Sequence, residues 1–304
     1  MTEAIAARRL SSAMGVEVSG IDLRGPIDEG TKQQLRSLLD ANALLLFRNQ
    51  DLEEGDQCRV LKIFGPIGDE KGDGKGFSYV SNVRPDGILG ETPLPFHADY
   101  DFRPYIPPVF SLYGHEIEGR SIPTIFVSLA NGYKLLPAEF KARIANLKIV
   151  NADDFTRGLS SAEYAKRYSL LKFKVPPPET THPRAVHPLV KPHPRTGEPL
   201  LFASEMHSSH IEGMDADSSE ALIQEVFSVI YSEENRFVHH WRKGDLVIWD
   251  NVAVQHGRRF DKDDAVQTRR TLRRVIVSEL TAGQLLGAGY NRPGSFDVTK
   301  AANS

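Results

Sequence analysis

Short runs of apolar, β-branched and aromatic residues recur along the whole chain, and they constrain its fold more than any other feature. Runs of this kind, bounded by Gly, Pro and polar residues, predict β-strands. Helical spacing is confined mainly to 29–42, 54–64 and a segment that begins after an Asp217/Ser218 cap. Because strands and helices do not alternate regularly, a βαβ fold is disfavoured. The predicted strands are 15–23, 43–48, 77–82, 109–117, 123–128, 199–204, 236–241, 245–250 and 271–280.

This pattern predicts a β-rich α+β protein whose core is a double-stranded β-helix, the jelly-roll type of barrel, with flanking helices. We expect one domain over 1–304, since no repeat or linker divides the chain. Residues 151–198 are rich in Pro, His and charge, which predicts a long insertion that serves as a lid. The Gly- and charge-rich segment 68–76 matches neither a calcium loop nor a P-loop, and it predicts a mobile loop rather than a site.

The amino-acid composition limits the kinds of partner that the chain can bind. The net charge is −3 and no basic block is present, which argues against binding to nucleic acid and favours a small-molecule substrate. The absence of a signal-like or membrane-spanning apolar run predicts a cytoplasmic protein with no membrane partner. The single cysteine, Cys58, allows no intrachain disulfide, and its place in the 54–64 helix predicts a core-filling role.

The run LPFHADYDF carries the chemistry, because it places His97 and Asp99 two residues apart on a predicted strand. Side chains so spaced on a strand point to the same face. A third ligand, His256, follows the apolar run GDLVIWDN and its turn. Two histidines and one carboxylate leave open positions on an ion, which is typical of non-haem iron(II) oxygenases. We expect structural or solvent-facing roles for the other histidines considered, His182, His187, His193, His207, His210, His239 and His240.

An arginine-rich run, TRRTLRRVIV, follows His256 and is predicted to form the adjacent antiparallel strand. A guanidinium can hold a carboxylate through two parallel hydrogen bonds, so an inward Arg270 would anchor a dicarboxylate. Arg274 would face the same side. Arg269 and Arg273 are expected to face solvent.

At these residues the chain resembles the family of 2-oxoglutarate-dependent dioxygenases typified by taurine dioxygenase and the phenoxyacetate herbicide dioxygenases. Several separate motifs in the right order are more specific than any one alone. The motifs are GVEVSGIDL (15–23), FGPIG (64–68), His97-Ala98-Asp99, HPRTGEPLLF (193–202), GDLVIWDN (244–251), His256 and the RR-x-x-x-R pattern of Arg269, Arg270 and Arg274.

Carried over by position, the resemblance makes His97, Asp99 and His256 the ligands of Fe(II). It implies that Arg270 and Thr124 bind the distal carboxylate of 2-oxoglutarate, although GRSIP (119–123) replaces the family's usual Gly-Gly-x-Thr turn. The expected reaction consumes O₂, converts 2-oxoglutarate to succinate and CO₂, and hydroxylates a substrate. Retention of the Asp99 carboxylate disfavours halogenation, because halogenating relatives lack it.

The substrate-binding residues are predicted from the resemblance and from their position beside the metal ligands. The arginine that matches Arg274 contacts an anionic substrate group in the taurine enzyme and lies close to the cosubstrate in relatives. The resemblance therefore implies that Arg274 binds both the 2-oxoglutarate cosubstrate and the substrate, and that the substrate is a small acid. Relatives form dimers or tetramers, so we expect a homo-oligomer. The residues that flank the metal strand or match substrate-facing positions are Ser81, Asn82, Tyr100, Phe102, Arg103 and Arg274.

Imidazole and carboxylate also bind zinc or nickel, so a zinc hydrolase, an isomerase or a non-catalytic ligand-binding barrel remains an alternative. None of these proteins would need Arg270 and Arg274 to face the metal. A hydrolase would turn over without O₂ or 2-oxoglutarate.

Overall fold

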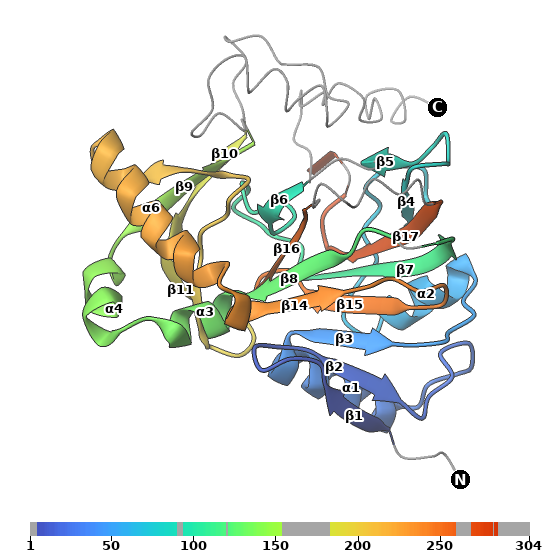
Figure 1. The fold of residues 1–304 in the computed structure, drawn as a ribbon. Helices are drawn as coiled ribbons and strands as arrows, with labels where there is room; N and C mark the ends of the chain where they lie inside the picture. Colours follow the sequence, from blue (N-terminus) through green and yellow to red (C-terminus); the bar gives the residue numbers. More distant parts are fainter. Residues whose placement is uncertain are drawn as a thin grey trace.

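The computed structural model describes residues 5–89, 94–119, 121–153, 183–259, 269–281 and 283–284. Two sheets face each other in these ranges (Figure 1). The larger sheet contains, in spatial order, β1 (Ala6–Arg9), β2 (Val16–Ser19), β3 (Leu44–Phe47), β15 (Leu246–Asp250), β7 (Val109–Ile117), β17 (Arg270–Val277), β4 (Ser78–Ser81) and β5 (Ile88–Leu89). The smaller sheet contains β14 (Arg236–His239), β8 (Thr124–Ser128), β16 (Val254–Arg258) and β6 (Leu94–His97).

Successive strands of the chain alternate between these sheets. The chain passes from β6 in the smaller sheet to β7 in the larger and back to β8, and it repeats the alternation through β15, β16 and β17. Such alternation winds the chain into a double-stranded β-helix, or jelly roll. The predicted β-rich core is therefore confirmed.

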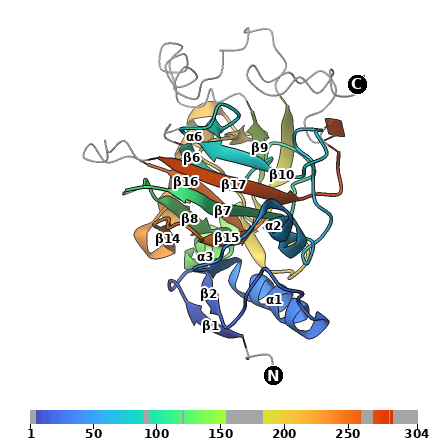
Figure 2. The same cartoon turned by 90° about the vertical axis from the view of Figure 1, so that its right-hand side faces the viewer.

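Three apolar clusters fill the layers of the molecule. Phe110, Phe126 and Trp249 belong to the cluster between the two sheets. A second cluster packs the outer face of the larger sheet against α1 (Glu29–Asn42) and α2 (Glu54–Leu61), and Cys58 packs against it as predicted. A third packs α6 (Ala216–Ile230) against the smaller sheet. Figure 2 shows α1 and α2 on one side of the strands and α6 at the far end.

Local signals explain where the helices begin and end. Helix α1 starts where the Asp28 side chain accepts a hydrogen bond from the Thr31 N–H, and it stops at Ala43, which has a left-handed φ of 61°. Helix α6 is capped by Asp215, not by the predicted Asp217/Ser218. The side chain of Asp215 accepts from the Ser218 N–H, so the capping residue lies two residues before Asp217. The remaining short helices are α3 (Leu129–Leu135), α4 (Ala138–Ile144) and η1 (Glu233–Asn235).

The segment predicted as an insertion, 151–198, contains regular strands in the part that the structure describes. Its first residues belong to β9 (Lys148–Ala152), which pairs with β10 (Arg184–Pro188) and β13 (Ser208–Ile211). A further pair is formed by β11 (Val190–Pro192) and β12 (Pro199–Leu201). Residues 154–182 lie outside the described residues, so the lid stays a prediction. Within the described part of the chain, no helix is long and apolar enough to cross a membrane.

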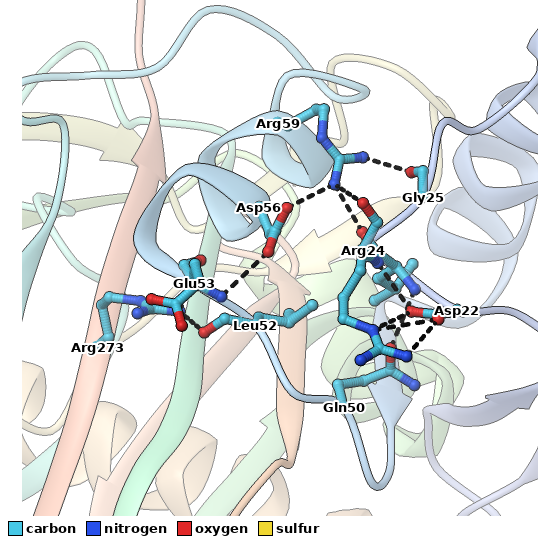
Figure 3. Close-up of polar contacts among 10 residues, drawn as sticks. Asp22, Arg24, Gly25, Gln50, Leu52, Glu53, Asp56, Arg59 and Arg273 are labelled. Atoms are coloured by element: carbon cyan, nitrogen blue, oxygen red, sulfur yellow. Dashed lines mark hydrogen bonds and ion pairs between the residues drawn. The ribbon is translucent and has the colours of Figure 1, made fainter.

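The predicted orientation of Arg273 on its strand is wrong. It was predicted to face solvent, but it is only 1% exposed. Its Nε donates to Gln57 Oε1 at 2.8 Å. Its Nη2 donates to the carbonyls of Leu52 at 2.7 Å and Glu53 at 3.0 Å (Figure 3). The outer face of β17 is covered by α2, so both faces of this strand are buried. Arg269, in contrast, has a side chain that is 56% exposed, as predicted.

Figure 3 also shows how α2 is fixed beneath the larger sheet. The guanidinium of Arg59 donates to the carbonyls of Leu23 at 3.0 Å, Arg24 at 2.7 Å and Gly25 at 2.7 Å. The Asp56 carboxylate accepts from the same group at 2.8 Å. These contacts anchor the helix that covers Arg273.

Candidate metal centre and cosubstrate pocket

His97, Asp99 and His256 converge at one end of the space between the sheets. In the antiparallel pairing of β6 with β16, His97 lies directly opposite His256. One ligand atom of each of the three residues lies within 4.8 Å of the others, and His256 Nε2 is 3.8 Å from Asp99 Oδ2. Within the described ranges, this is the one group of three or more His, Cys, Asp or Glu residues with such geometry. The structure thus brings the predicted triad together.

Asp99 is positioned by a turn and not, as predicted, by the strand that carries His97. Strand β6 ends at His97, and Asp99 lies in the following turn, where Tyr100 has a φ of 65°. The Asn251 side chain fixes this turn: its Oδ1 accepts from the Asp99 N–H at 3.0 Å, and its Nδ2 donates to the Asp99 carbonyl at 2.8 Å. The carboxylate is therefore placed by a clamped turn and not by strand alternation.

Close approach of β6 to β16 depends on Gly257, the residue after His256. A Cβ atom at this position would lie 3.0 Å from the Phe96 ring and 3.2 Å from the Leu94 carbonyl oxygen. A side chain here would therefore require the Phe96 ring or the Leu94 carbonyl to shift. Gly257 therefore allows the two histidines to share one side of the site.

The protonation states suit a divalent cation. Burial lowers the pKa of both histidines, and the neighbouring His97 helps to lower the pKa of His256 to about 3. Burial would raise the pKa of Asp99, but the charge of Arg274 and the two imidazoles outweigh it and set that pKa at about 2. His97 Nδ1 lies 2.8 Å from the Pro95 carbonyl, to which it can donate, leaving Nε2 for a metal. Neutral imidazoles and an ionised carboxylate are the forms that bind metals.

Arg270 lies across the site on the larger sheet. The prediction that its strand adjoins that of His256 is wrong: β17 lies between β7 and β4, whereas β16 belongs to the smaller sheet. Consecutive strands of a jelly roll alternate between sheets, so the two residues lie on opposite sheets instead. Arg270 is buried, and its Nη1 lies 3.4 Å from the carbonyl of Ile122, two residues before Thr124.

Thr124 opens β8 and is also buried. Its Oγ1 accepts a hydrogen bond from Trp241 Nε1 at 2.9 Å. Because that bond uses a lone pair of the hydroxyl, the hydroxyl hydrogen can be donated to a ligand. The contact between Arg270 and Ile122 brings the guanidinium to the start of β8. A guanidinium and a hydroxyl so placed suit one carboxylate.

Arg274 has the same orientation on β17 as Arg270. The even-numbered Leu272 and Ile276 of this strand pack between the sheets, whereas Val275 and Val277 pack outside, so the even positions face inward. Arg274 Nη1 lies 3.2 Å from Asp99 Oδ1. Its Nε and Nη2 donate to the two oxygens of Glu70, at 3.0 and 2.8 Å.

The comparisons with known proteins agree with this geometry. The family described as "Taurine catabolism dioxygenase TauD, TfdA family" matches residues 6–276. The chain belongs to the TauD, TfdA family.

Curated relatives of this TauD, TfdA family member span nearly its whole length. A pentalenolactone F synthase of Streptomyces avermitilis is 26% identical, covering 88% of this chain and 91% of that protein. An alpha-ketoglutarate-dependent 2,4-dichlorophenoxyacetate dioxygenase of Cupriavidus pinatubonensis is 26% identical, covering 90% and 97%. The crystal structure of AAD-2 in complex with Mn(II) and N-oxalylglycine superimposes with a TM-score of 0.70 at 27% identity, covering 90% and 97%.

The chain is therefore a 2-oxoglutarate-dependent dioxygenase that uses Fe(II) and O₂ and acts on a small organic substrate. The residues present fit this metal. Asp99 Oδ2 is buried and has no hydrogen-bond partner among the described residues, which suits an oxygen that binds a cation. Two imidazoles and one carboxylate on the same side of a site are the donor set of such enzymes.

The predicted substrate-side residues divide into two groups. Tyr100 and Arg274 meet at the carboxylate of Glu70, next to Asp99. Phe102 packs edge-on against His207, with ring centroids 5.0 Å apart, and His207 packs in the same way against His97 at 5.9 Å. These three predicted residues therefore lie close to the triad.

The other three do not contact the triad in the described structure. The Ser81 hydroxyl lies 2.9 Å from the Thr271 hydroxyl, on the same outer face of the sheet as Arg273, so Ser81 points away from the site. Asn82 Oδ1 accepts from the Arg270 N–H at 2.8 Å and supports the backbone of the arginine. Arg103 lies over the Phe102 ring, 5.7 Å from its centroid, and burial lowers its pKa.

Sequence reasoning missed Glu70, Asn251 and His207. Glu70 lies in 68–76, for which the sequence predicts a mobile loop rather than a site, and its carboxylate contacts both Tyr100 and Arg274. His207 was predicted to be structural; its Nδ1 lies 2.5 Å from Asp101 Oδ1, and its ring packs against His97. Asn251 was part of the motif GDLVIWDN, and its place directly after a buried strand was the available signal.

Proposed function

We propose that this dioxygenase hydroxylates a small acidic substrate at an iron held by His97, Asp99 and His256. The support for this assignment is the triad itself, together with Arg270, which points inward from the opposite sheet and contacts Ile122, two residues before the buried Thr124. Iron(II) held by these three residues would supply, with 2-oxoglutarate, the activation of O₂ that gives succinate, CO₂ and a substrate in which one oxygen atom is inserted into a C–H bond.

The protein residues position the reactants. In the proposed complex, the Arg270 guanidinium and the Thr124 hydroxyl bind the distal carboxylate of 2-oxoglutarate. Arg274 orients Asp99 through its Nη1, while its Nε and Nη2 donate to the carboxylate of Glu70. The rings of Phe102 and His207 pack beside His97 and help to fix the orientation of its imidazole.

The acidic substrate is supported by Arg274 and by the names of relatives. These relatives include the 2,4-dichlorophenoxyacetate dioxygenase above and an (S)-phenoxypropionate/alpha-ketoglutarate-dioxygenase of Sphingobium herbicidovorans, which is 26% identical over 81% of this chain. Both named substrates carry a carboxylate. The comparisons favour this oxygenase reading over the zinc hydrolase, isomerase and ligand-binding alternatives.

Anaerobic titration of the iron(II)-loaded protein with 2-oxoglutarate tests the cosubstrate site. The wild type should develop the weak visible charge-transfer band of the iron chelate. Arg270→Ala should weaken 2-oxoglutarate binding by about tenfold to hundredfold, the cost of a lost charge-assisted pair. Arg269→Ala, which removes the exposed neighbour, is the matched control and should bind like the wild type. No band in the wild type, or equal affinity in Arg270→Ala, would contradict the assignment.

Two further expectations stay predictions. If 151–198 acts as a lid, the segment should show slower hydrogen exchange when Mn(II) and N-oxalylglycine are added. If the chain is a homo-oligomer, light scattering should give a dimer or tetramer mass.

A further inference from the structure

The carboxylate of Glu70 binds the Nε and Nη2 donors of Arg274, which are the donors that the acidic group of a substrate would use. Arg274 donates to both oxygens of Glu70 in parallel, at 3.0 Å from Nε and 2.8 Å from Nη2. This fork is the geometry by which arginine recognises carboxylates in general. The Tyr100 hydroxyl adds a third hydrogen bond to Glu70, at 2.8 Å.

The backbone explains why Glu70 lies there. Ile67 forms an antiparallel bridge with Val277, and the Gly68 N–H donates to the Ile276 carbonyl at 3.0 Å. Continuing the same antiparallel register along β17 brings Glu70 opposite Arg274. Gly68 makes this approach possible, since a Cβ atom there would lie 2.8 Å from the side chain of Ile276.

The segment that carries Glu70 has a defined shape. The Asp69 carboxylate accepts from the N–H groups of Gly72 at 2.9 Å and Gly74 at 2.8 Å. Gly72, Gly74 and Gly76 have φ values of 69°, 76° and 72°, which other residues rarely adopt. The hydrogen bonds of Asp69 fix this turn, and the turn holds the Glu70 carboxylate against Arg274.

The charges around Arg274 determine how a substrate acid can bind. The side chains of Arg274, Asp99 and Glu70 are 10%, 14% and 18% exposed, so one cation lies between two carboxylates with little water. A third carboxylate, from a substrate, must displace Glu70 from Arg274 or meet an unfavourable negative potential. A neutral ligand of the same shape meets neither cost.

We infer that Glu70 is a specificity-determining residue, which competes with the acidic group of the substrate for the guanidinium of Arg274. The inference rests on the proposed acidic substrate. Glu70 therefore lowers the affinity of the site for acids relative to neutral analogues, and a substrate acid binds only by displacing it.

Binding measurements on Glu70→Gln test this inference. Glutamine keeps the size of the side chain and an acceptor for Tyr100 but removes the negative charge. The probes are 2,4-dichlorophenoxyacetate and its neutral amide, titrated by calorimetry into protein loaded with Mn(II) and N-oxalylglycine, so that no turnover occurs. We expect the acid to bind at least about tenfold more tightly to Glu70→Gln than to the wild type, with amide binding unchanged.

Glu118→Gln is the matched control, because Glu118 is exposed and its nearest charged partner is Arg269 at 3.5 Å. Acid binding that is unchanged or weaker in Glu70→Gln, or an equal gain for acid and amide, overturns the inference. Acid binding to neither protein also overturns it, together with the acidic substrate. The N-oxalylglycine titration of the same samples reports separately on the cosubstrate site, so loss of that binding in the wild type would instead contradict the proposed function.

Discussion

Asn251 clamps the backbone of Asp99 from both sides, accepting from its N–H at 3.0 Å and donating to its carbonyl at 2.8 Å. Asn251 is completely buried and comes directly after β15, in the turn that leads to the strand of His256. Its Nδ2 also donates to the Pro107 carbonyl at 3.1 Å. One side chain thus couples the positions of two proposed ligands that are far apart in the sequence.

Asn251→Ala should weaken metal binding by about tenfold to hundredfold, as substitutions that misorient a ligand usually do. The physical reason is that the turn carrying Asp99 loses both hydrogen bonds that fix it. Competition for Fe(II) or Mn(II) against a chelator measures the effect. The control is Asn42→Ala, where the lost amide bond is to Leu38 in α1. Equal metal affinity in Asn251→Ala and wild type would show that the clamp is not needed.

Thr124→Val should raise the KM for 2-oxoglutarate by about tenfold, because the site loses one hydroxyl donor to the distal carboxylate. Thr124→Ser keeps the hydroxyl, and its KM for 2-oxoglutarate should stay within about threefold of the wild-type value. Valine also removes the acceptor of Trp241 Nε1, so urea denaturation is needed to measure the stability of each variant. If Val and Ser variants had the same KM, the Thr124 assignment would be lost.

Arg273→Ala should destabilise the fold by about 3 kcal/mol or more, since the acceptors on buried Gln57 and Leu52 lose their donor, as does the part-buried carbonyl of Glu53. Arg269→Ala should cost less than about 1 kcal/mol, because its ion pair with Glu116 is exposed. Urea denaturation of both variants gives the comparison. Similar costs for the two arginines would contradict the burial of Arg273.

Asp250→Asn should be destabilising at neutral pH and nearly harmless in acid. Burial raises the pKa of Asp250, but the hydrogen bond from His193 and the charge of Arg195 outweigh it and hold that pKa below its ordinary value. A carboxylate whose pKa is lower in the folded state stabilises the fold above its unfolded pKa, near 4. That contribution is lost as the pH falls through the folded pKa.

The expected cost of Asp250→Asn at pH 7 is about 3 kcal/mol, and the difference from wild type should shrink below about pH 4. Unfolding free energies measured in urea across this range test the prediction. Asp40→Asn is the matched control, because Asp40 pairs with the same Arg195 but is 39% exposed. It should cost less than about 1 kcal/mol. A pH-independent cost for Asp250→Asn would rule out the linkage.

The sequence by itself determined most strands of the two facing sheets, the jelly-roll class of the fold and the proposed ligands. Period-two patterning marks a strand whatever surrounds it, and the ligand types in His97-Ala98-Asp99 and His256 restrict the metal chemistry. The inward orientation of Arg270 and Arg274 also followed, because alternation along β17 ties the two residues to one face.

Only the tertiary structure decided which sheet each strand joins and what covers each face. Alternation does not reveal that α2 covers the outer face of β17, so Arg273 was misjudged. Nor does it reveal that β16 and β17 belong to opposite sheets, or that a register begun at Ile67 and Val277 places Glu70 on Arg274. These contacts join residues distant in the chain, and their energies depend on burial and charge that exist only once the layers have packed.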